Sequence, residues 1–486
     1  MALKDIIGRK REIAILDSVW KSSDPEFLAL YGRRRVGKTY LIRQFFSEKG
    51  FFLETAGSKD KPMKTQIANF MKALSTTFYH GTELKNPHSW EEAFELLTKN
   101  LSSIPKSKKI VIFFDELPWM ATKRSGLLQS IDHYWNLHWS KMKNIIFITC
   151  GSAASWMLDK LIYAKGGLHK RITRKILLEP FNLQETREFL KSRSIKLNEK
   201  QILDVYMAIG GIPFYLKAVQ KGLSASQIID EICFDKNGLL HNEFVNLFES
   251  LFTHSGVNLA IVKGIVKNGN CLSREEIIAY TGVQSGGTLN DRLRELEISG
   301  FIQGFVPYGK KSRGHYFRVV DEFSLFHLYW IEPLLQMRGF QQEHYWQRLK
   351  KTPSVSSWRG QAYENVCLKH TAEIRKGLGL NDISCQIGSW RYIPKKGSKE
   401  TGAQIDLLFD REDGIVNLCE IKYSEHLFSI DKSYAKQLAN KIDVFERHFP
   451  TNKQIFISLI TTEGLRPSIW SEDLVSQVID LKALFK

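Results

Sequence analysis

Three apolar runs in the first third of the chain have the pattern of buried parallel strands. They are "EFLALYG" (26–32), "KKIVIFFDELPWM" (108–120) and "KNIIFITCGS" (143–152). Strands that are covered on both faces read as near-continuous apolar runs rather than as alternating ones. After the first run, "KTYLIRQFF" (38–46) has apolar residues at helical spacing. The pattern predicts an α/β core with a parallel sheet over residues 1–181.

The middle of the chain changes to helical periodicity. Residues 182–250 read as amphipathic helices, which we expect to form a lid on the core. Over residues 251–320 we expect three helices, then two strands joined by a basic turn, which is the layout of a winged helix. The helices are "NLAIVKGIVK", "SREEIIAYTG" and "GGTLNDRLRELEISG", and the strands are "FIQGFVPYG" and "HYFRVVD". Ser273 and Glu276 have the spacing of a capping box that opens the second helix.

The last third predicts a second α/β unit. Residues 321–355 are aromatic-rich and helical in period, and we expect them to link the winged helix to residues 356–486. There, "TGAQIDLLFDREDGIVNLCEIKYSE" (401–425) is a hairpin candidate whose first strand ends near Phe409. A helix precedes it, and a helix and a further strand follow it.

The composition suggests a polyanionic partner. The chain has 486 residues, which predicts two to four domains. Its formal net charge is +17. Such an excess of Lys and Arg favours nucleic acid first, with DNA as the expected partner, and an anionic membrane second. A merely basic surface is the alternative.

The cysteines and the apolar runs predict a cytoplasmic protein. The six cysteines are scattered and include no C-x-x-C pair, as expected for reduced buried thiols. The N-terminus "MALKDIIGRKREIAIL" carries charges where a signal peptide needs an apolar segment. No uncharged apolar run approaches the ~20 residues that span a bilayer, so we expect no membrane contact.

The segment between the first strand and its helix fits the phosphate-binding pattern G-x-x-x-x-G-K-[ST]. Strand, glycine-rich loop and helix in this order predict a nucleoside triphosphate site. Loop amides and the helix N-terminus would hold the phosphates, Lys38 would reach the terminal ones, and Thr39 would ligate magnesium. The residues of the loop are Gly32, Arg33, Arg34, Arg35, Val36, Gly37, Lys38 and Thr39.

Further candidates for this site lie at the ends of the later strands. Asp115 would hold the magnesium through water, and Glu116 would polarise the attacking water. Thr149 or Ser152 would sense the terminal phosphate, although strand ends are commonly polar. Arg171 would stabilise the transferring phosphoryl group in its own subunit or in a neighbour's, the second case implying a homo-oligomer. A solvated basic turn is the alternative for Arg171.

Two acids and a lysine mark the hairpin of the last third. Side chains alternate along a strand, so Glu420 and Lys422 share one face. Asp406 lies between apolar neighbours on the partner strand, where an ionised carboxylate is costly unless it is paired or metal-bound. We expect Asp406 and Glu420 to bind magnesium, with Lys422 acting on the attacking water or the phosphate.

The segments "IIGRKREIAIL", "GRRRVGKT", "FFDELPWM", "CGSAASWM", "LHKRITRKILLEPF" and "GGIPFYL" resemble the archaeal-type ATPases of the AAA+ and STAND-like P-loop class. The resemblance implies ATP and Mg²⁺ as cofactors. It implies that Gly8 and Arg9 lie on the adenine side and that Pro213 of the lid lies against the base. The lid arginine that is usual in AAA+ machines is not evident, so a slow nucleotide switch fits as well as a motor.

The last third is similar to the PD-(D/E)xK nuclease superfamily in its order of helix, three strands, helix and strand. That similarity implies a catalytic role for Asp406, Glu420 and Lys422, and an accessory role for Glu364 on the first helix. It also implies backbone contacts by Tyr434, Lys436 and Gln437. An E-I-K sequence on a strand is often only an edge, so a domain that binds without cleaving is the alternative.

The sequence hypothesis is therefore an α/β multi-domain protein with a P-loop core, a helical lid, a winged helix and a nuclease-like C-terminal domain. It would bind and hydrolyse ATP, and its nucleotide state would gate a magnesium-dependent DNA endonuclease. The alternative is a nucleotide-switched regulator or scaffold. Under either hypothesis the winged helix would contact DNA through its third helix and the basic wing, or would dock on protein.

Overall fold

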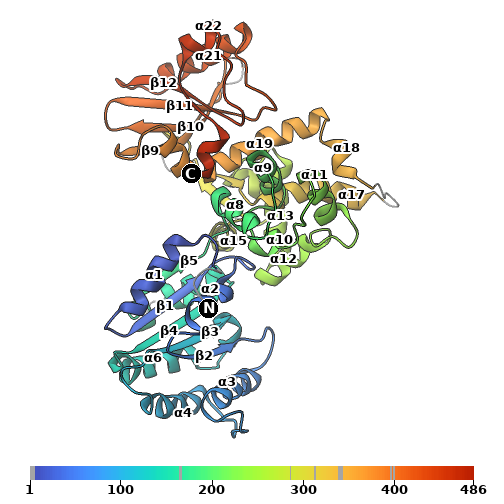
Figure 1. Cartoon of the computed structure of the whole chain (residues 1–486). Coiled ribbons are helices and arrows are strands. Elements are labelled where there is room, and N and C mark those ends of the chain that lie inside the picture. Colours follow the sequence, from blue (N-terminus) through green and yellow to red (C-terminus); the bar gives the residue numbers. More distant parts are fainter. Residues whose placement is uncertain are drawn as a thin grey trace.

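The computed structural model describes residues 6–163, 167–284, 286–310, 314–337, 343–394, 397 and 400–486. Figure 1 shows two α/β lobes at opposite ends of the molecule and a mainly helical region between them. The N-terminal lobe contains β1 to β5, and the C-terminal lobe contains β9 to β13. The predicted fold class is confirmed: a parallel sheet with helices forms the first lobe, and a separate mixed sheet forms the last.

The N-terminal lobe is built on a five-stranded sheet of order β2-β3-β4-β1-β5, with every neighbouring pair parallel. Its strands are β1 (Glu26–Tyr31), β2 (Phe51–Ala56), β3 (Ile110–Asp115), β4 (Ile145–Gly151) and β5 (Arg174–Leu177). Its helices and helical turns are α1 (Lys10–Lys21), α2 (Lys38–Phe46), α3 (Met63–Phe78), α4 (Trp90–Ser102), α5 (Leu117–Met120), α6 (Leu127–Leu137), η2 (Trp139–Lys141), α7 (Ala154–Trp156), η3 (Met157–Ile162) and η4 (Gly167–Lys170).

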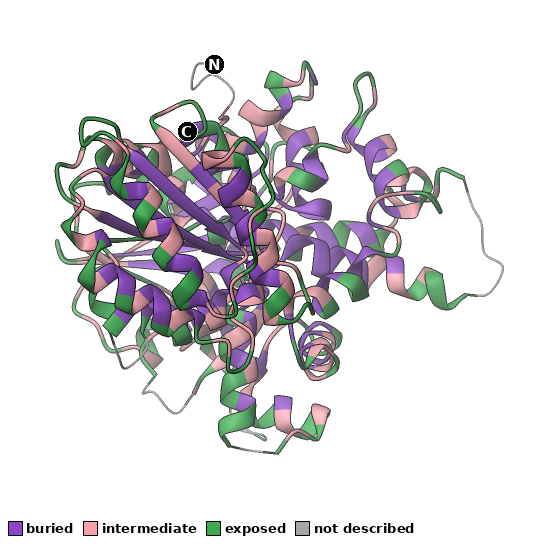
Figure 2. Cartoon of the chain, turned by 90° about the horizontal axis from the view of Figure 1, so that it is seen from below, coloured by how far each residue is buried: buried purple, intermediate pink, exposed green. Residues whose placement is uncertain are grey.

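Helices cover both faces of this sheet, which explains the near-continuous apolar runs of its strands. In β3 and β4 every residue is buried. Figure 2 shows these strands in purple between helices whose outer sides are pink or green. One face packs on α3, α4 and α6, and the other packs on α1 and α2.

The region between the lobes begins with the lid and continues into a three-helix unit with a small sheet of order β6-β8-β7. The lid contains α8 (Leu183–Ser192), α9 (Glu199–Ile209), α10 (Pro213–Leu216), α11 (Ala225–Ile229), η5 (Asp230–Phe234) and α12 (Glu243–Leu251). The unit that follows contains α13 (Ser255–Lys267), β6 (Leu272–Ser273), α14 (Arg274–Thr281), α15 (Gly287–Ile298), β7 (Ile302–Phe305) and β8 (Tyr316–Val319). Both hydrogen bonds of the capping box between Ser273 and Glu276 are present.

An aromatic connector joins this unit to the C-terminal lobe. It contains α16 (Glu322–Phe326), η6 (His327–Ile331), α17 (Glu332–Gln336) and α18 (Tyr345–Leu349). Trp346, buried in α18, packs edge-on against Phe326 and Trp358. Trp358 belongs to the first helix of the C-terminal lobe, so the connector is packed on both sides and is not an open linker.

The C-terminal lobe has a five-stranded sheet of order β13-β12-β11-β10-β9, in which β9, β10 and β11 are antiparallel and β11, β12 and β13 are parallel. Its elements are α19 (Pro353–Lys369), α20 (Thr371–Gly377), β9 (Cys385–Tyr392), β10 (Ala403–Arg411), β11 (Ile415–Lys422), α21 (Lys432–His448), β12 (Gln454–Thr461), α22 (Ile469–Leu474), β13 (Val475–Ile479) and η7 (Leu481–Phe485). The predicted hairpin is β10–β11, although β10 continues to Arg411 rather than ending near Phe409.

The chain end returns from the C-terminal sheet to the lid. The Arg187 guanidinium of α8 donates to the Phe485 carbonyl at 2.9 Å. One apolar cluster runs without a break from the N-terminal sheet through the lid and connector to α19 and η7. Continuous apolar packing therefore connects the N-terminal lobe with the C-terminal lobe.

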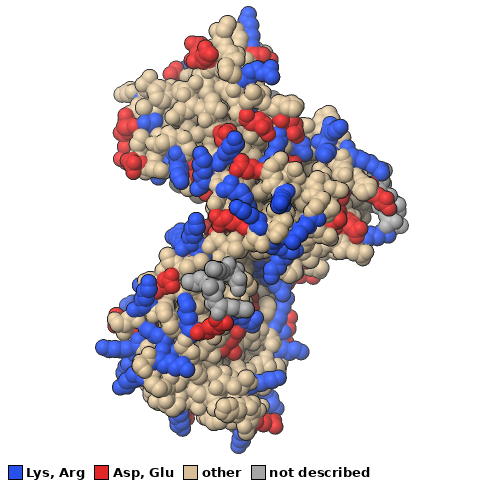
Figure 3. All heavy atoms as spheres, viewed as in Figure 1, with Lys and Arg blue, Asp and Glu red and all other residues tan. Residues whose placement is uncertain are grey.

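Positive charge is spread over the whole molecule and gathers over its middle. Figure 3 shows lysine and arginine side chains crowded on this face between the two lobes. None of the helices in the described ranges is long and apolar enough to cross a membrane.

Candidate nucleotide site and a second carboxylate pocket

The phosphate loop joins β1 to α2, and two of its glycines are required by geometry. Gly37 has φ +95°, a left-handed conformation that favours glycine. At Gly32, a Cβ would lie 2.4 Å from the Leu178 carbonyl oxygen, which is backbone and cannot move aside cheaply. The loop therefore closes tightly at the N-terminus of α2, where backbone N–H groups face an anion.

Ser152 connects the loop lysine with the candidate catalytic acid. The Lys38 ammonium donates to the Gly32 and Arg33 carbonyls at 2.9 and 3.0 Å, and to Ser152 Oγ at 2.9 Å. The Ser152 hydroxyl and its backbone N–H both donate to the Glu116 carboxylate. Glu116 itself has φ +49°, and a non-glycine residue held there is typical of functional sites.

The oxygen atoms predicted to hold magnesium lie together. Thr39 Oγ1 donates to Asp115 Oδ2 at 2.6 Å, so a hydroxyl at the start of α2 meets a carboxylate at the end of β3. Hard oxygen ligands of this kind suit Mg²⁺, which is usually held by one or two protein side chains and by substrate phosphates. The pair fits the ion that the sequence predicts.

A cavity of about 490 Å³ adjoins this loop. Such a volume is within the range of small-molecule sites. Its lining includes residues from the N-terminal segment, the loop, the strand ends and the lid: Ile6, Ile7, Arg9, Arg34, Arg35, Val36, Gly37, Lys38, Thr39, Tyr40, Leu41, Asp115, Glu116, Trp119, Ser152, Phe181, Phe189, Pro213, Phe214 and Lys217. Residues predicted from five separate segments are thus brought to one cavity.

The N-terminal segment and the lid close the apolar side of this cavity. Arg9, beside Gly8, donates to the Glu179 and Val36 carbonyls at 2.7 and 3.1 Å and lies 4.4 Å from the Phe181 ring centre. Phe181 in turn meets Gly211 of the lid, where a Cβ would lie 1.8 Å from the Phe181 carbonyl oxygen. The Gly-Gly-Ile-Pro segment is therefore held against the core, and Pro213 lines the cavity.

The three arginines of the loop have different surroundings. Arg34 lies 6.0 Å from the Trp119 ring centre at the cavity. Arg35 lines the cavity and pairs with Glu243 of α12. The Arg33 side chain is buried outside the lining and pairs with Asp321 at the start of α16. Arg33 therefore contributes only its backbone to the nucleotide site, where its carbonyl accepts a hydrogen bond from Lys38.

Two other candidates do not lie on the cavity wall. The Thr149 hydroxyl is fully buried and donates to the Leu28 carbonyl at 3.3 Å, so of the two strand-end residues Ser152 is the one that faces the cavity. Arg171 is exposed in the turn before β5 and is not part of the lining. Its action on a neighbouring subunit stays a prediction.

Lys38→Ala is expected to weaken ATP binding on the order of 100-fold, because it removes the ammonium that pairs with the terminal phosphates. The fold should persist, since the change removes no apolar core side chain. Titration with a fluorescent ATP analogue measures the affinity. Lys217→Ala, at the lid side of the same cavity, is the control and should retain most of the affinity. Equal affinities for wild type and Lys38→Ala would contradict the assignment.

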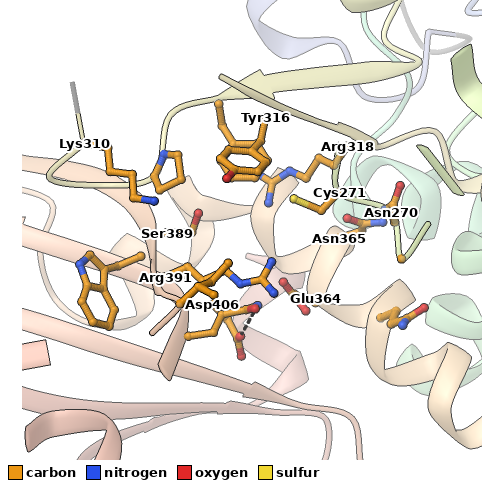
Figure 4. Close-up of a pocket in the computed structure, with 17 residues that line it drawn as sticks. Asn270, Cys271, Lys310, Tyr316, Arg318, Glu364, Asn365, Ser389, Arg391 and Asp406 are labelled. Atoms are coloured by element: carbon orange, nitrogen blue, oxygen red, sulfur yellow. Dashed lines mark hydrogen bonds between the residues drawn. The ribbon is translucent and has the colours of Figure 1, made fainter. Parts of the chain in front are cut away.

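A second set of acids meets in the C-terminal lobe. Asp406 on β10 and Glu364 on α19 line one cavity, shown in Figure 4. Burial, and then the Asp406 charge, raise the pKa of Glu364 above its ordinary value. Burial, and then the Glu420 charge, raise the pKa of Asp406. Asp406 Oδ2 also accepts from the Ile421 N–H at 3.2 Å, which fixes β10 against β11 near the acids.

Glu420 has its own cations. Its carboxylate pairs with Lys422 at 2.8 Å and with Lys441 of α21 at 2.6 Å, and it accepts from the Tyr434 hydroxyl at 3.1 Å. The pKa of Glu420 is lowered, because these cations outweigh its burial. The described part of the chain contains no group of three His, Cys, Asp or Glu side chains arranged to hold a metal. Carboxylate oxygens suit Mg²⁺ chemically, but an ion that uses Glu420 has to replace contacts with the lysines.

Sequence reasoning missed Lys441 and expected Tyr434 to contact a phosphate backbone. The spacing could have revealed Lys441. Residues seven apart on a helix lie on the same face, so Tyr434 and Lys441 of α21 reach the Glu420 carboxylate together. Lys436 and Gln437, the other two expected backbone contacts, belong to the same helix.

The three-helix unit contacts both lobes, and contact of its third helix with a DNA groove stays a prediction. Arg294 of α15 pairs with Asp159 of the N-terminal lobe at 2.7 Å. After β7, the Tyr308 N–H donates to the Ser389 carbonyl of β9 at 2.7 Å. Lys311 and Arg313 of the basic turn lie outside the described residues.

Comparison with known proteins agrees with the first site. A model of an ATPase domain found predominantly in Archaea matches residues 6–219. An uncharacterised protein of Methanocaldococcus jannaschii is 23% identical over 425 residues, which are 86% of this chain and 88% of that protein. An uncharacterised ATP-binding protein of the same organism is 44% identical over 43 residues, 9% of this chain and 73% of that protein.

Solved structures give weaker likenesses. A Walker-type ATPase of Pyrococcus abyssi has a TM-score of 0.47 and 18% identity, covering 67% of this chain and 97% of its own. The ORC2 protein of Aeropyrum pernix has a TM-score of 0.44 and 13% identity, covering 68% and 94%. Both scores are low, so the assignment depends on the domain match and on the geometry of the loop. Over residues 6–219 this chain is similar to an ATPase domain found predominantly in Archaea, and the phosphate loop lies within that match.

Proposed function

We propose that this chain is a DNA-directed enzyme in which ATP, bound and hydrolysed in the N-terminal cavity, gates a magnesium-dependent endonuclease in the C-terminal lobe. In the first site Lys38 holds the phosphates, Thr39 and Asp115 hold the magnesium ion, and Glu116 orients the attacking water. In the second site Asp406 and Glu420 hold the metal, Lys422 stabilises charge on the phosphate, and Glu364 assists.

The observation that carries the gating proposal is a buried ion pair between the two sites. Arg33 of the phosphate loop donates to Asp321, and each side chain is only 4% exposed. Asp321 lies two residues after the end of β8, and the β8 residue Arg318 lines the cavity of Glu364 and Asp406. In this proposal a shift of the loop backbone moves Asp321 and, three residues earlier in the chain, Arg318 of the second cavity.

A second contact follows the same path. Glu322, the first residue of α16, pairs with Lys369 of α19 at 2.6 Å. Glu364 belongs to the same helix, α19. The segment that Asp321 begins is therefore tied both to the phosphate loop and to the helix that carries an acid of the second cavity.

At the second site, the protein's own groups set the charge that a phosphodiester would meet. A bound magnesium ion would supply a Lewis acid and an activated water. Lys422 and Lys441 offer ammonium groups beside the acids, and Tyr434 holds Glu420 in place. Asp406 and Glu364 supply carboxylates whose pKa is raised by burial first and by neighbouring carboxylates second.

The test is cleavage of single-stranded, linear duplex and plasmid DNA with Mg²⁺ and ATP, ADP or no nucleotide. Wild type should cleave at rates that depend on the nucleotide. Asp321→Asn alone leaves Arg33 buried without its partner, at a cost of about 3–5 kcal/mol. The double variant Arg33→Leu with Asp321→Asn removes both charges, and the asparagine still accepts from Ser324 at the start of α16.

The double variant is expected to recover the melting temperature that the single variant loses, and to cleave at one rate under all three nucleotide conditions. Arg174→Leu, which removes an exposed arginine of β5 outside this path and outside both cavities, is the control and should keep the nucleotide dependence. Retained nucleotide dependence in a folded double variant would contradict the coupling path.

A regulator or scaffold without nuclease activity is the second candidate. The pairing of Glu420 with two lysines favours it, because the single negative charge of this acid is already compensated within the lobe. The absence of metal-dependent cleavage by wild type on any DNA, with every nucleotide, would select this candidate.

A further inference from the structure

The cavity that holds Asp406 and Glu364 is built by two parts of the chain. One wall comes from β9, β10 and α19 of the C-terminal lobe, and the other comes from β8 and the flanking segments of the three-helix unit. Figure 4 shows Tyr316, Arg318 and Cys271 above the cavity and Arg391, Asp406 and Glu364 below it. Its volume is about 330 Å³.

Positive side chains surround the acids of this cavity. Lys310, Arg318 and Arg391 all line it. In Figure 4 the guanidinium groups of Arg318 and Arg391 point into the same space, toward Glu364. The two come from different parts of the chain, since Arg318 lies on β8 and Arg391 lies on β9.

The two arginines differ in what holds them. Arg318 donates to Gln303 Oε1 at 2.7 and 3.1 Å and lies 4.9 Å from the Phe305 ring centre, so its position is fixed by β7. Burial lowers the pKa of Arg318, and the Glu364 charge opposes this. No hydrogen bond or ion pair of the exposed Arg391 side chain is found among the described residues. The cavity therefore joins a fixed guanidinium with one whose donors are available.

Aromatic and apolar side chains line the space beside these cations. Tyr316 and Phe305 face each other across β7 and β8, with ring centres 6.1 Å apart. Both line the cavity, as do Pro307 and Ile393. Planar rings beside arginines are the combination that binds unpaired bases and their phosphates.

We propose that this cavity binds one nucleotide unit of a single-stranded DNA chain, with its phosphate between Arg318 and Arg391 and its base against Tyr316. The proposal rests on the proposed nuclease function and specifies the substrate class of that same site. Guanidinium groups suit this task because they present several donors to phosphate oxygens in a fixed plane.

The size of the cavity excludes a duplex. About 330 Å³ is near the lower limit of small-molecule sites. B-DNA is far larger, since its major groove alone is about 12 Å wide. The wall formed by β8 lies directly opposite the acids, so a duplex meets the three-helix unit before it reaches Asp406. A single strand, a frayed end or a splayed base fits the opening.

The test measures binding of fluorescent single-stranded and double-stranded oligonucleotides of one sequence to the full chain. Fluorescence anisotropy monitors the binding, and EDTA is present so that cleavage does not occur. Wild type should prefer the single strand. Arg391→Ala should weaken its binding on the order of ten-fold and lower the salt slope by about 0.7, the value for one lost single-strand phosphate contact. Arg391 is exposed, so the variant should fold.

Arg466→Ala is the matched control, because Arg466 is an exposed arginine of the same lobe outside the cavity. It should leave the affinity for the single strand nearly unchanged. Tyr316→Leu keeps an apolar side chain but removes the ring, and should weaken binding without changing the salt slope. Equal effects of Arg391→Ala and Arg466→Ala, no binding, or equal affinity for duplex and single strand would each overturn the proposal.

Failure of this inference and failure of the proposed nuclease are separable. A protein that binds the single strand through Arg391 but cleaves no DNA supports the inference and contradicts the nuclease. A protein that cleaves DNA but binds it independently of Arg391 supports the nuclease and contradicts the inference.

Discussion

Glu116→Gln is expected to bind ATP with nearly wild-type affinity and to hydrolyse it about 100- to 10,000-fold more slowly. This range is the typical contribution of a side chain that accepts or orients a proton in the transition state. Glutamine keeps the size of the side chain and one accepting oxygen for Ser152. It loses the negative charge that polarises water, and it leaves Lys38, Thr39 and Asp115 intact.

The structure gives this variant a specific second effect. Ser152 Oγ accepts from Lys38 and donates to Glu116, so one hydroxyl links the phosphate-binding cation with the catalytic acid. The amide substitution weakens that link without removing the hydroxyl. Release of inorganic phosphate and binding of a fluorescent ATP analogue should therefore be measured on the same samples.

Glu54→Gln is the matched control for this experiment. Glu54 lies on β2 and pairs with Arg43 at 2.7 Å, outside the cavity lining. It should retain the wild-type rate of hydrolysis. Hydrolysis by Glu116→Gln at the wild-type rate would remove Glu116 from the catalytic role.

The nucleotide site could be predicted from the sequence because most of its residues are local. The segment from Gly32 to Thr39 is contiguous, and Asp115 and Glu116 follow directly on a strand whose apolar pattern is plain. Parallel strands end at one edge of a sheet, so the residues after β1, β3 and β4 meet there. The order of the strands and the apolar face of the lid were less evident, since both depend on contacts between distant segments.

The contacts between the sites could not be predicted in this way. Arg33 and Asp321 are 288 residues apart in the sequence. Arg33 lies within the phosphate-binding motif, so the sequence predicts that it contacts the phosphates. Arg318 lies within the predicted strand "HYFRVVD", and nothing local in the sequence indicates that it faces Glu364. Charged pairs of this kind depend on how whole units pack, because either partner alone is compatible with an exposed surface.

The hairpin of the last third was predicted, but the pairing of its first strand with β9 was not. The pairing of β10 with β9 shifts between Ile405 and Leu408, and Asp406 lies within that irregularity. A bulge changes which face a side chain takes, so simple alternation does not place Asp406. The β10–β11 register, which pairs Leu407 with Cys419, brings Asp406 next to Glu420, and α19 brings Glu364 to the same cavity as Asp406.

Asp406→Ala is expected to lower DNA cleavage on the order of 1,000-fold or more, while ATP hydrolysis by the N-terminal domain continues. The estimate corresponds to losing the several kcal/mol by which a bound metal stabilises charge in the transition state. Asp406→Asn should have a similar effect, because the amide has no charge for the cation. Isothermal titration with Mn²⁺ should show weaker metal binding by both variants.

The controls separate loss of the site from loss of the fold. Asp413→Ala changes an exposed acid of the same hairpin, paired with Arg411, and should cleave DNA as wild type does. Burial and the Glu420 charge disfavour the ionised form of Asp406 and so raise its pKa. Asp406→Asn removes this unfavourable charge, so it should not lower the melting temperature at neutral pH.

Lys422→Ala distinguishes the nuclease from the scaffold. If Asp406 and Glu420 bind a metal, this variant should lose cleavage and still bind Mn²⁺, because an ammonium group is not a ligand. If Glu420 serves only in a buried ionic cluster, removing Lys422 leaves part of its charge uncompensated and should lower the melting temperature, with no cleavage to lose. The two readings therefore predict opposite results for metal binding and stability in one variant, and titration together with thermal melting decides between them.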